Sequence, residues 1–343
     1  MPEEGFLTLK AISVIVVNYN GKHLLRACLE SLYSQYFKNI EIILVDNASQ
    51  DGSTEYVREG FPDVKVISLP RNIGFAGANN EGFKQAKGHY IMLINNDAEV
   101  DKNCIERLYA VMEPRPDVGI GAAKMIVYGK NIIDSAGDGF TTNLKGFKRG
   151  EGMPSSHFYD REELVFGACA GAAIYRRVML EETGFFDEDF FLIQEDTDLN
   201  FRAQLAGWKA LYVPSAIVHH KVRASIGHMS DVAIYYALRN SELVRIKNVP
   251  LSFFLRCLPE FIIGEMAEFI YFALRYGKLR LYINAKVDAM KLLPGMSKKR
   301  RQIMKTVRVT NDYLRSMMTP AWNKEFVRTK VKKFFASKEE NVR

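Results

Sequence analysis

Cysteine is scarce in this sequence, with four residues in 343 and no CxxC pair among them. This wide spacing excludes a zinc ribbon and a CxxC redox motif. Each cysteine lies in an apolar run, so we expect buried free thiols, as in proteins of reducing compartments. They are Cys28, Cys104, Cys169 and Cys257. Residues 1–10 hold early acidic residues and no long apolar stretch, so we expect no signal peptide there.

The common glycine-rich phosphate-binding motifs are also missing. No GxGxxG follows the first apolar run, and no GxxxxGK[ST] occurs anywhere. The sequence has no internal repeat and no low-complexity stretch. Apolar residues make up 48% and charged residues 25%, which excludes a wholly disordered chain, a collagen and a disulfide-rich miniprotein.

Charge is uneven along the chain. The whole sequence has 47 Lys and Arg against 40 Asp and Glu, a net charge of +7. Residues 291–343 hold fifteen Lys and Arg and four Asp and Glu, a net charge of +11, so residues 1–290 carry −4. A basic tail is typical of proteins that meet phosphates at a membrane surface or on nucleic acid, and also of a plain solvated surface.

Short apolar runs alternate with helical patterns over the first 125 residues. β-Branched runs predict buried strands, and apolar residues at helical spacing predict helices between them. The expected strands are 12–17, 40–45, 64–68, 90–94 and 119–125, and the expected helices are 22–34, 53–60, 74–86 and 103–112. This order predicts an α/β fold with an open, twisted, mostly parallel sheet flanked by helices, whose ligands bind beyond the carboxyl ends of the strands.

The remaining sequence is less regular. Residues 126–165 are rich in Gly, Asn, Ser and charge, and we expect loops or a small irregular insertion there. The sheet pattern resumes with a strand at 166–175, a helix at 196–206 and a strand from 209 whose last residues are His219 and His220. We therefore predict one domain over 10–250 and a helical, amphipathic and basic C-terminal region over 251–343.

An apolar stripe at helical spacing covers residues 251–276. Its length would suffice to cross a bilayer, but Glu260, Glu265 and Glu268 lie near its middle. Each charge there costs about 2.5–3.5 kcal/mol on insertion scales, which outweighs the gain from the apolar residues. We expect an amphipathic helix that lies in a membrane interface or packs on the body.

Four polar clusters follow four successive strands. One such cluster alone is ordinary loop composition, but four at the same edge of a parallel sheet predict a ligand site. The clusters are Asn18–Gly21, Asp46–Ser49 with Asp51–Ser53, Asn72–Asn80, and Asn95–Glu99. Asp46 and the Asn18–Asn20 loop can hydrogen-bond a base edge. Asp97, with Asn95 or Glu99, offers hard oxygen ligands that suit Mg²⁺ or Mn²⁺ on a diphosphate.

Seven motifs follow one another along the sequence. They are VNYNG (17–21), VDNASQDGS (45–53), NIGFAGANNEG (72–82), LINNDAEV (93–100), GACAGAAIYRR (167–177), GFFDEDFFLIQEDTDLNFRAQLAGW (184–208) and VHH (218–220). In these motifs the sequence resembles the family-2 glycosyltransferases of the GT-A fold, in particular their rhamnosyltransferase-like branch. The resemblance covers about residues 10–250. It implies the fold of nucleotide-diphospho-sugar transferases, here with a C-terminal helical extension.

The resemblance also implies roles for single residues. Asp46 would contact the nucleotide base, and Asp97 would be the metal-binding aspartate of a DxD-type motif, with Mg²⁺ or Mn²⁺ as the cofactor. This chain reads Asn95-Asn96-Asp97 and so offers one carboxylate instead of two. We predict that the nucleotide sugar is bound by Asn18, Tyr19, Asn20, Asp46, Asn72, Gly77, Asn95 and Asn96.

The family pattern places catalysis at Glu195 and Asp196, with Asp196 as the general base. An inverting transfer needs one carboxylate that takes the proton of the acceptor hydroxyl on the face opposite the leaving diphosphate. Asp196 is equally placed to cap the helix that follows. The resemblance makes His219 a metal or diphosphate ligand beside Asp97, whereas a hydrogen-bonded structural histidine is the alternative, and His220 is the weaker candidate.

These features together predict an inverting glycosyltransferase. The donor would be a nucleotide-diphospho-sugar, rhamnose or another hexose being the sugar. The acceptor would be a glycan or polyprenyl-linked sugar of surface polysaccharide or cell-wall biosynthesis. We expect a cytoplasmic protein, held peripherally at the inner face of the cell membrane by its C-terminal region, with no nucleic acid partner. The alternatives are an inactive family member that acts as a scaffold and a sugar-phosphate nucleotidyltransferase.

Overall fold

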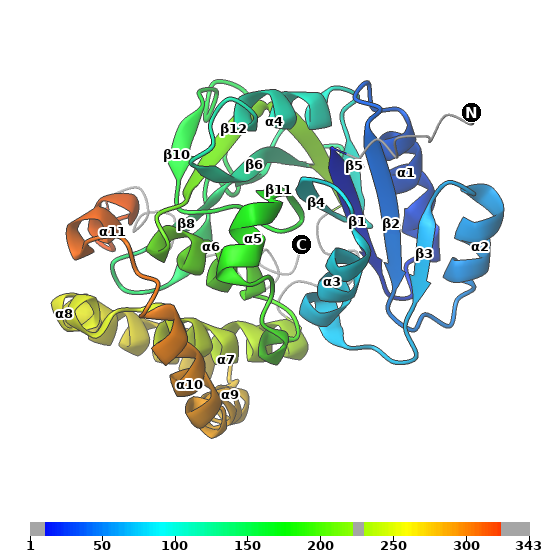
Figure 1. Ribbon diagram of the computed structural model, residues 1–343. Helices are drawn as coiled ribbons and strands as arrows, with labels where there is room; N and C mark the ends of the chain where they lie inside the picture. The colour runs from blue at the N-terminus through cyan, green and yellow to red at the C-terminus, as the bar shows by residue number, and fades with distance from the viewer. Residues whose placement is uncertain (1–10, 222–229, 324–343) are drawn as a thin grey trace.

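The computed structural model describes residues 11–221 and 230–323 (Figure 1). The expectation for residues 1–10 and the lysines of the tail after residue 323 lie outside the described residues. The chain folds into a large mixed sheet with helices on its faces and a group of C-terminal helices at one side.

The first part of the chain forms the parallel half of the sheet. The strands are β1 (Ile12–Asn18), β2 (Ile40–Asp46), β3 (Lys65–Ser68) and β4 (Tyr90–Asn95), and the helices between them are α1 (Lys22–Tyr33), α2 (Ser53–Gly60) and α3 (Gly74–Gln85). β1 pairs in parallel with both β2 and β4, and β3 continues the sheet beside β2. The predicted βαβ order is confirmed, because each connection carries the helix that a parallel crossover requires.

The second part completes the sheet with antiparallel and parallel pairs. Its main elements are β5 (Ala98–Val100), α4 (Cys104–Met112), β6 (Val118–Val127), β11 (Ala172–Arg176), α5 (Arg177–Thr183), a 3₁₀ turn η1 (Glu188–Phe190), α6 (Glu195–Leu205) and β12 (Lys209–His220). The spatial order is β10-β12-β6-β11-β4-β1-β2-β3. β11 runs antiparallel to β4 and β6, whereas β12 runs parallel to β6. The mostly parallel sheet is therefore confirmed, with an antiparallel strand in its centre.

Two segments differ from the expected elements. The predicted loops at 126–165 contain four short strands, β7 (Ile133–Ala136), β8 (Asp138–Phe140), β9 (Gly146–Lys148) and β10 (Glu163–Val165). The single strand predicted at 166–175 is wrong, since only Ala172–Arg176 is a strand there. The side chain of Asn200 lies across Gly167 and exchanges hydrogen bonds with the backbone of Ala168, and Gly167 itself makes only an isolated bridge to Asp138, so this stretch forms no continuous strand.

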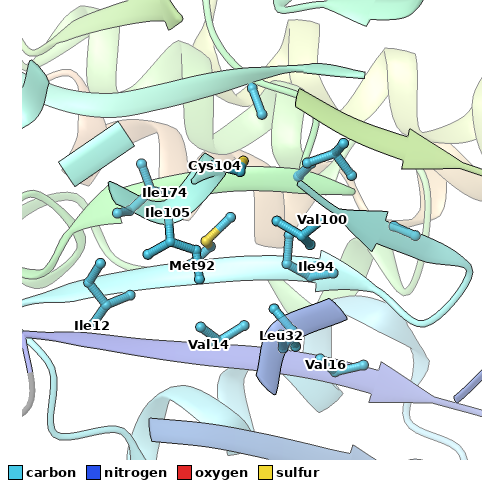
Figure 2. Close-up of a cluster of buried hydrophobic side chains, with 14 of the residues drawn as sticks. Ile12, Val14, Val16, Leu32, Met92, Ile94, Val100, Cys104, Ile105 and Ile174 are labelled. Atoms are coloured by element: carbon cyan, nitrogen blue, oxygen red, sulfur yellow. The ribbon is translucent and has the colours of Figure 1, made fainter. Parts of the chain in front are cut away.

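Alternate residues of β1 fill two cores on opposite faces of the sheet. Ile12, Val14 and Val16 face the core under α1 and α4 that Figure 2 shows, while Ile15 faces the other core. This is the period-two pattern of a strand buried on both faces. The thiols of Cys28, Cys104 and Cys257 are buried and that of Cys169 is half-buried, and all four are free.

The C-terminal helices pack on the body and share a core with it. They are α7 (Asp231–Asn248), α8 (Leu251–Phe269), a π-helical segment η2 (Ile270–Arg275), α9 (Leu279–Lys291), α10 (Leu293–Ile303) and α11 (Asn311–Met317). Phe253 and Met296 join Phe140, Phe166 and other body residues in one apolar cluster. The helix predicted over 251–276 is confirmed, and among the described residues no helix is both long and apolar enough to cross a membrane.

Candidate active site

A cavity of about 310 Å³ lies at the carboxyl ends of the parallel strands. β1, β2 and β4 end side by side there, with Asn18 and Asp46 in register. The cavity is lined by Val17, Tyr19, Asn47, Asn72, Gly74, Phe75, Asn95, Asn96, Asp97, Phe191, Leu192 and His220. The structure thus brings together Tyr19, Asn72, Asn95, Asn96 and Asp97 of the predicted site residues.

Asn18 connects three segments behind the cavity lining. Its buried amide donates to Asp46 Oδ1 (3.1 Å) and Ser49 Oγ (3.1 Å), and its oxygen accepts from Asn96 Nδ2 (2.8 Å). The second oxygen of Asp46 accepts from the backbone N–H of Ser49 at 3.0 Å. Asn18 and Asp46 are therefore buried supports of the cavity in this structure, and the base contact predicted for Asp46 stays a prediction.

Asn20 ties the loop after β1 to the loop after β2. Its backbone is left-handed, with a φ of 50°. Its N–H donates to Ser49 Oγ (2.8 Å), and its side-chain oxygen accepts from the N–H of Gln50 (2.8 Å). Tyr19 lies between these anchors with 51% of its surface exposed, so its ring is open to a ligand in the cavity.

Asn47 and Asn72 shape the wall formed by the start of α3. Asn72 Oδ1 accepts from Asn47 Nδ2 (3.0 Å) and from the N–H of Gly74 (2.9 Å), while Asn47 Oδ1 accepts from the N–H of Ile73 (2.9 Å). Gly77 lies one turn further on, against the side chain of Ile73, and is not in the cavity lining. Asn47 therefore lines the cavity, whereas Gly77, which we expected to bind the nucleotide sugar, does not.

Gly74 is the point where the loop before α6 meets α3. Its φ is +80°, and a Cβ there would lie 2.4 Å from the carbonyl oxygen of Phe191. The same carbonyl accepts from the N–H of Ala76 at 3.1 Å. Only glycine allows this approach, which seats Phe191 and Leu192 over the cavity.

His220, and not His219, lies beside Asp97. His220 Nε2 is 3.1 Å from Asp97 Oδ1, whereas His219 Nε2 is 3.3 Å from Asp101 Oδ1. Neighbouring residues of a strand point to opposite faces, so only one histidine of β12 can reach the cavity. The expected placement of His219 beside Asp97 is wrong by one position, and the metal or diphosphate role passes to His220 as a prediction.

Asp134 orients the imidazole of His220 from the other side. Asp134 Oδ2 is 2.9 Å from His220 Nδ1, and both carboxylate oxygens of Asp134 accept from Lys148 Nζ at 3.0–3.1 Å. Burial disfavours the imidazolium, but the hydrogen bonds to Asp134 and Asp97 outweigh it and raise the pKa of His220 to about 9. Burial would raise the pKa of Asp134, but its interactions with His220 and Lys148 outweigh burial and lower this pKa to about 2.

The donor set on the cavity fits a divalent cation shared with an anionic ligand. Asp97 supplies a hard oxygen, and His220 would supply an imidazole nitrogen once a cation displaces the proton between Nε2 and Asp97. Its partner Asp134 is the usual outer support of a ligating histidine. No cluster of three or more potential ligand side chains occurs in the described part of the chain. The protein would thus fill only part of a coordination sphere and leave positions for phosphate oxygens.

Glu195 and Asp196 begin α6 and do not line the cavity. Asp196 Oδ1 accepts from the N–H of Thr197 (2.7 Å) and Oδ2 from that of Ala170 (3.2 Å). Burial raises the pKa of Asp196, and these N–H groups and the charge of Lys148 limit the rise. The helix cap is Gln194, so the alternative role of Asp196 as N-cap is not what the structure has.

Glu195 differs from its neighbour in having no partner for one oxygen. It is 5% exposed, and Oε2 makes no hydrogen bond to any residue that the structure describes. Burial first, and then the charges of Asp196 and Asp138, raise the pKa of Glu195 well above its ordinary value. The pKa of Asp138 is raised by the same causes. The pKa of Glu195 is raised the more strongly of the two, so Asp196 gives up its proton before Glu195 does.

Helix α7 holds the loop that leads to these acids. The amide of the buried Asn240 donates to the carbonyl groups of Phe190 (2.9 Å), Leu192 (2.8 Å) and Ile193 (2.6 Å). Phe191, Ile193 and Gln194 all have positive φ values, between 63° and 72°. Such backbone persists only where its surroundings fix it, and Asn240 supplies that constraint.

Comparison with known proteins shows which family the sequence matches. Residues 13–184 match the model of glycosyl transferase family 2. Glycosyltransferase GlyA of Streptococcus pneumoniae is 26% identical over 223 residues, which are 62% of this chain and 30% of GlyA. The N-acetylglucosaminyl-diphospho-decaprenol L-rhamnosyltransferase of Mycobacterium tuberculosis is 26% identical over 273 residues, 67% of this chain and 85% of that protein. The chain therefore spans less than a third of GlyA.

Two solved structures have a fold similar to that of this chain. S. aureus TarS 1–349 in complex with UDP aligns with a TM-score of 0.52 and 19% identity over 89% of this chain and 91% of that one. GalNAc-T7 with UDP, GalNAc and Mn²⁺ aligns with a TM-score of 0.55 and 19% identity over 70% of this chain and 48% of that one. At this identity the likeness confirms the fold, which is the predicted GT-A type.

Proposed function

Because the chain belongs to glycosyl transferase family 2, we propose that it is an inverting glycosyltransferase. Its donor is a nucleotide-diphospho-sugar, and its acceptor is a hydroxyl of a glycan or lipid-linked glycan in surface polysaccharide or cell-wall biosynthesis. One observation carries the proposal. A cavity at the strand ends is lined by Asp97, His220 and Phe191, and the loop of Phe191 continues into Glu195 and Asp196.

Binding of the donor follows from the cavity lining. Tyr19 offers an exposed ring for the base, and the amides of Asn95 and Asn96 offer donors for phosphate or sugar oxygens. Asp97 and His220 would hold Mg²⁺ or Mn²⁺, and the cation would neutralise the charge that develops on the leaving diphosphate. The solved GalNAc-T7 complex, which contains UDP and Mn²⁺, supports a cation of this class.

Proton transfer is the proposed task of Asp196. Its two backbone N–H partners fix the carboxylate and favour its ionised form, as a general base requires. Asp196 takes the proton from the acceptor hydroxyl while the acceptor oxygen bonds to the anomeric carbon and the diphosphate leaves. Burial raises the pKa of Glu195, which limits the negative charge beside the base.

The acceptor and the place of action are proposed from the relatives. The rhamnosyltransferase of M. tuberculosis is named for a decaprenol-diphosphate acceptor. We propose a polyprenyl-linked sugar as the acceptor here, rhamnose or another hexose as the sugar transferred, and a peripheral position at the inner face of the cell membrane.

A donor panel with one matched pair of variants tests the proposal. UDP, GDP and dTDP sugars are incubated with the full chain, with Mn²⁺ or Mg²⁺ and with EDTA, and release of nucleotide is measured. We expect release for one donor class, lost in EDTA. In a transfer assay with that donor and a membrane extract as acceptor source, Asp196→Asn should lower the rate about 10²–10⁴-fold, because it removes the base.

The control is Asp117→Asn, which changes an exposed carboxylate paired with Lys209 far from the cavity. It should keep the wild-type rate. Normal transfer by a folded Asp196→Asn variant would contradict the assigned mechanism. If the wild type released no nucleotide with any donor and transferred no sugar to the extract, the result would favour the inactive scaffold.

A further inference from the structure

Helix α8 has an unusual distribution of polarity. Leu251, Leu255, Ile262 and Met266 of α8, followed by Ile270 and Leu274 of η2, are each between 43% and 65% exposed. Their spacing places them on one face, which we call the outer face of α8. At 1.5 Å per residue, the stretch from 251 to 274 is roughly 35 Å long. A soluble helix normally turns such a stripe toward the core.

The two carboxylates in the second half of α8, Glu265 and Glu268, point the other way. Glu265 lies 2.6 Å from Lys286 and 3.1 Å from Arg245, and Glu268 lies 2.7 Å from Lys145. The side chains of Glu265 and Glu268 are only 20% and 12% exposed. The ion-pair network therefore lies between α8, α7 and α9, and the apolar side chains are left outside.

We propose that the outer face of α8 is a docking surface for an anionic lipid bilayer. A helix that turns its carboxylates inward and its leucine, isoleucine and methionine side chains outward suits an environment that is itself apolar. Helix α8 lies at the edge of the molecule, on the opposite side from α2 (Figure 1). Insertion parallel to the surface needs no spanning helix, which agrees with the absence of one among the described residues.

The basic residues that follow α8 favour a bilayer over a second copy of the chain as the partner of this face. Arg280, Lys298 and Arg301 are exposed and form no salt bridge within the part of the chain that the structure describes. They belong to the region that directly follows α8, and residues 291–343 carry a net charge of +11. Cations near an anionic surface stabilise the lipid-bound state. A two-fold contact between copies would instead bring two such basic regions together.

The choice of a bilayer rests on the proposed function, since a polyprenyl-linked acceptor is held in a membrane. The docking surface itself needs neither donor nor acceptor. It can therefore be tested by lipid binding alone, and this inference and the enzyme assignment can fail separately.

The experiment is co-sedimentation of the full chain with vesicles of phosphatidylcholine, with and without phosphatidylglycerol. The variant is Ile262→Gln with Met266→Gln, whose parent side chains are 49% and 60% exposed. The control is Leu164→Gln with Val178→Gln, whose parent side chains are likewise 49% and 60% exposed but lie on β10 and α5. Because all four side chains are exposed, the variants should fold, which thermal unfolding checks.

We expect the wild type to bind the anionic vesicles. The α8 variant should lose about tenfold or more in partition coefficient, and the control should stay within about twofold. Binding of the α8 variant equal to that of wild type overturns the proposal, as does a wild type that ignores anionic vesicles at low salt. A wild-type dimer without vesicles that the α8 variant breaks would also overturn it, and would assign the face to a second copy.

Discussion

His219 and His220 are neighbours in sequence but face opposite sides of β12. The sequence predicts that a histidine at the end of this strand reaches Asp97, and this part is confirmed. It does not reveal which one, because the direction of a side chain depends on the pairing of β12 with β5 and β6, and that register forms between segments far apart in the chain.

The pair of histidines provides a matched test of the cation site. His220→Ala should lower the affinity for Mn²⁺ in the presence of UDP at least about tenfold, because it removes a nitrogen donor beside Asp97. His219→Ala should leave that affinity unchanged, since His219 contacts Asp101. Calorimetric titration of Mn²⁺ into each variant measures both. Equal affinities of the two variants would exclude the assignment of His220.

A second prediction at this scale concerns Lys148 and the pH dependence of transfer. The ionisable groups around Asp196 are Glu195 of its own helix, Asp138 of β8, Lys148 of β9, and Cys169 and Tyr175 near β11. A base acts when ionised, so kcat/KM falls as the pH drops through the pKa of Asp196. The charge of Lys148 lowers that pKa.

Lys148→Met should therefore move the acidic limb of the profile to higher pH at saturating cation. Lys124→Met is the control, since the buried Lys124 pairs with Asp160 and does not act on Asp196. A limb that stays in place in Lys148→Met would show that Lys148 does not act on the base.

Two residues of the cavity lining, Asn47 and Phe191, could not be predicted from the sequence, for physical reasons. Asn47 lies in a cluster that the sequence singled out, but its role as a bridge to Asn72 depends on where α3 begins. Phe191 enters the cavity only because Asn240, almost 50 positions later, holds its loop in left-handed backbone. Such long-range constraints leave no local pattern in the sequence.

Some helices and strands form because of their local sequence, and others because of contacts with distant segments. The βαβ units of the first hundred residues follow from periodicity, since each buried strand carries a continuous apolar run. The strands β7 to β10 are three or four residues long and rich in glycine or charge, so their composition resembles that of loops. Their partners in the sheet make them strands.

The junction of α3 with the loop before α6 can be tested by two glycine substitutions. Gly74→Ala adds a methyl group 2.4 Å from the carbonyl oxygen of Phe191, at a φ of +80°. Gly129→Ala has a similar φ of +69° but nothing within 4 Å. The control should cost about 1–2 kcal/mol of unfolding free energy from backbone strain alone.

Gly74→Ala should cost about 1–3 kcal/mol more than the control, because the loop must also move. Urea unfolding of both variants measures the difference. Equal losses would mean that the contact between Gly74 and Phe191 does not constrain the loop.

At the scale of the whole molecule, a buried carboxylate connects the catalytic body to the C-terminal helices. Asp198 of α6 is fully buried and accepts from Arg202 (2.8 Å), Lys247 (2.9 Å) and Asn248 (2.8 Å). Burial would raise its pKa, but Arg202 and Lys247 outweigh it and lower the pKa to about 2. Lys247 also pairs with Asp187, which in turn pairs with Lys299 of α10.

This network predicts acid sensitivity of the fold. The pKa of Asp198 is lower in the folded than in the unfolded chain, where it is about 3.9. Its contribution to stability is therefore complete above about pH 4 and is lost as the pH falls toward about 2. Urea unfolding from pH 6 downward should show the decline.

Asp198→Asn should reduce this part of the decline and cost about 3–5 kcal/mol at neutral pH, because it leaves buried cations unpaired. Asp312→Asn removes an exposed partner of Arg256 and should change stability by less than about 1 kcal/mol at any pH. A neutral-pH loss for Asp198→Asn no larger than that of Asp312→Asn would contradict the prediction.

The cavity draws its wall from distant parts of the chain, and this has a consequence for synthesis on the ribosome. Asp97 and His220, which meet at 3.1 Å, are 123 positions apart. The parallel strands β1, β2 and β4 can pair as soon as residues up to 95 have emerged, and Asp97 follows two residues later. β12 is the last strand in the described part of the chain, so an unfinished chain has the ends of the parallel strands but not His220. The contact between Asp97 and His220 therefore forms in one late step, when β12 docks beside β6.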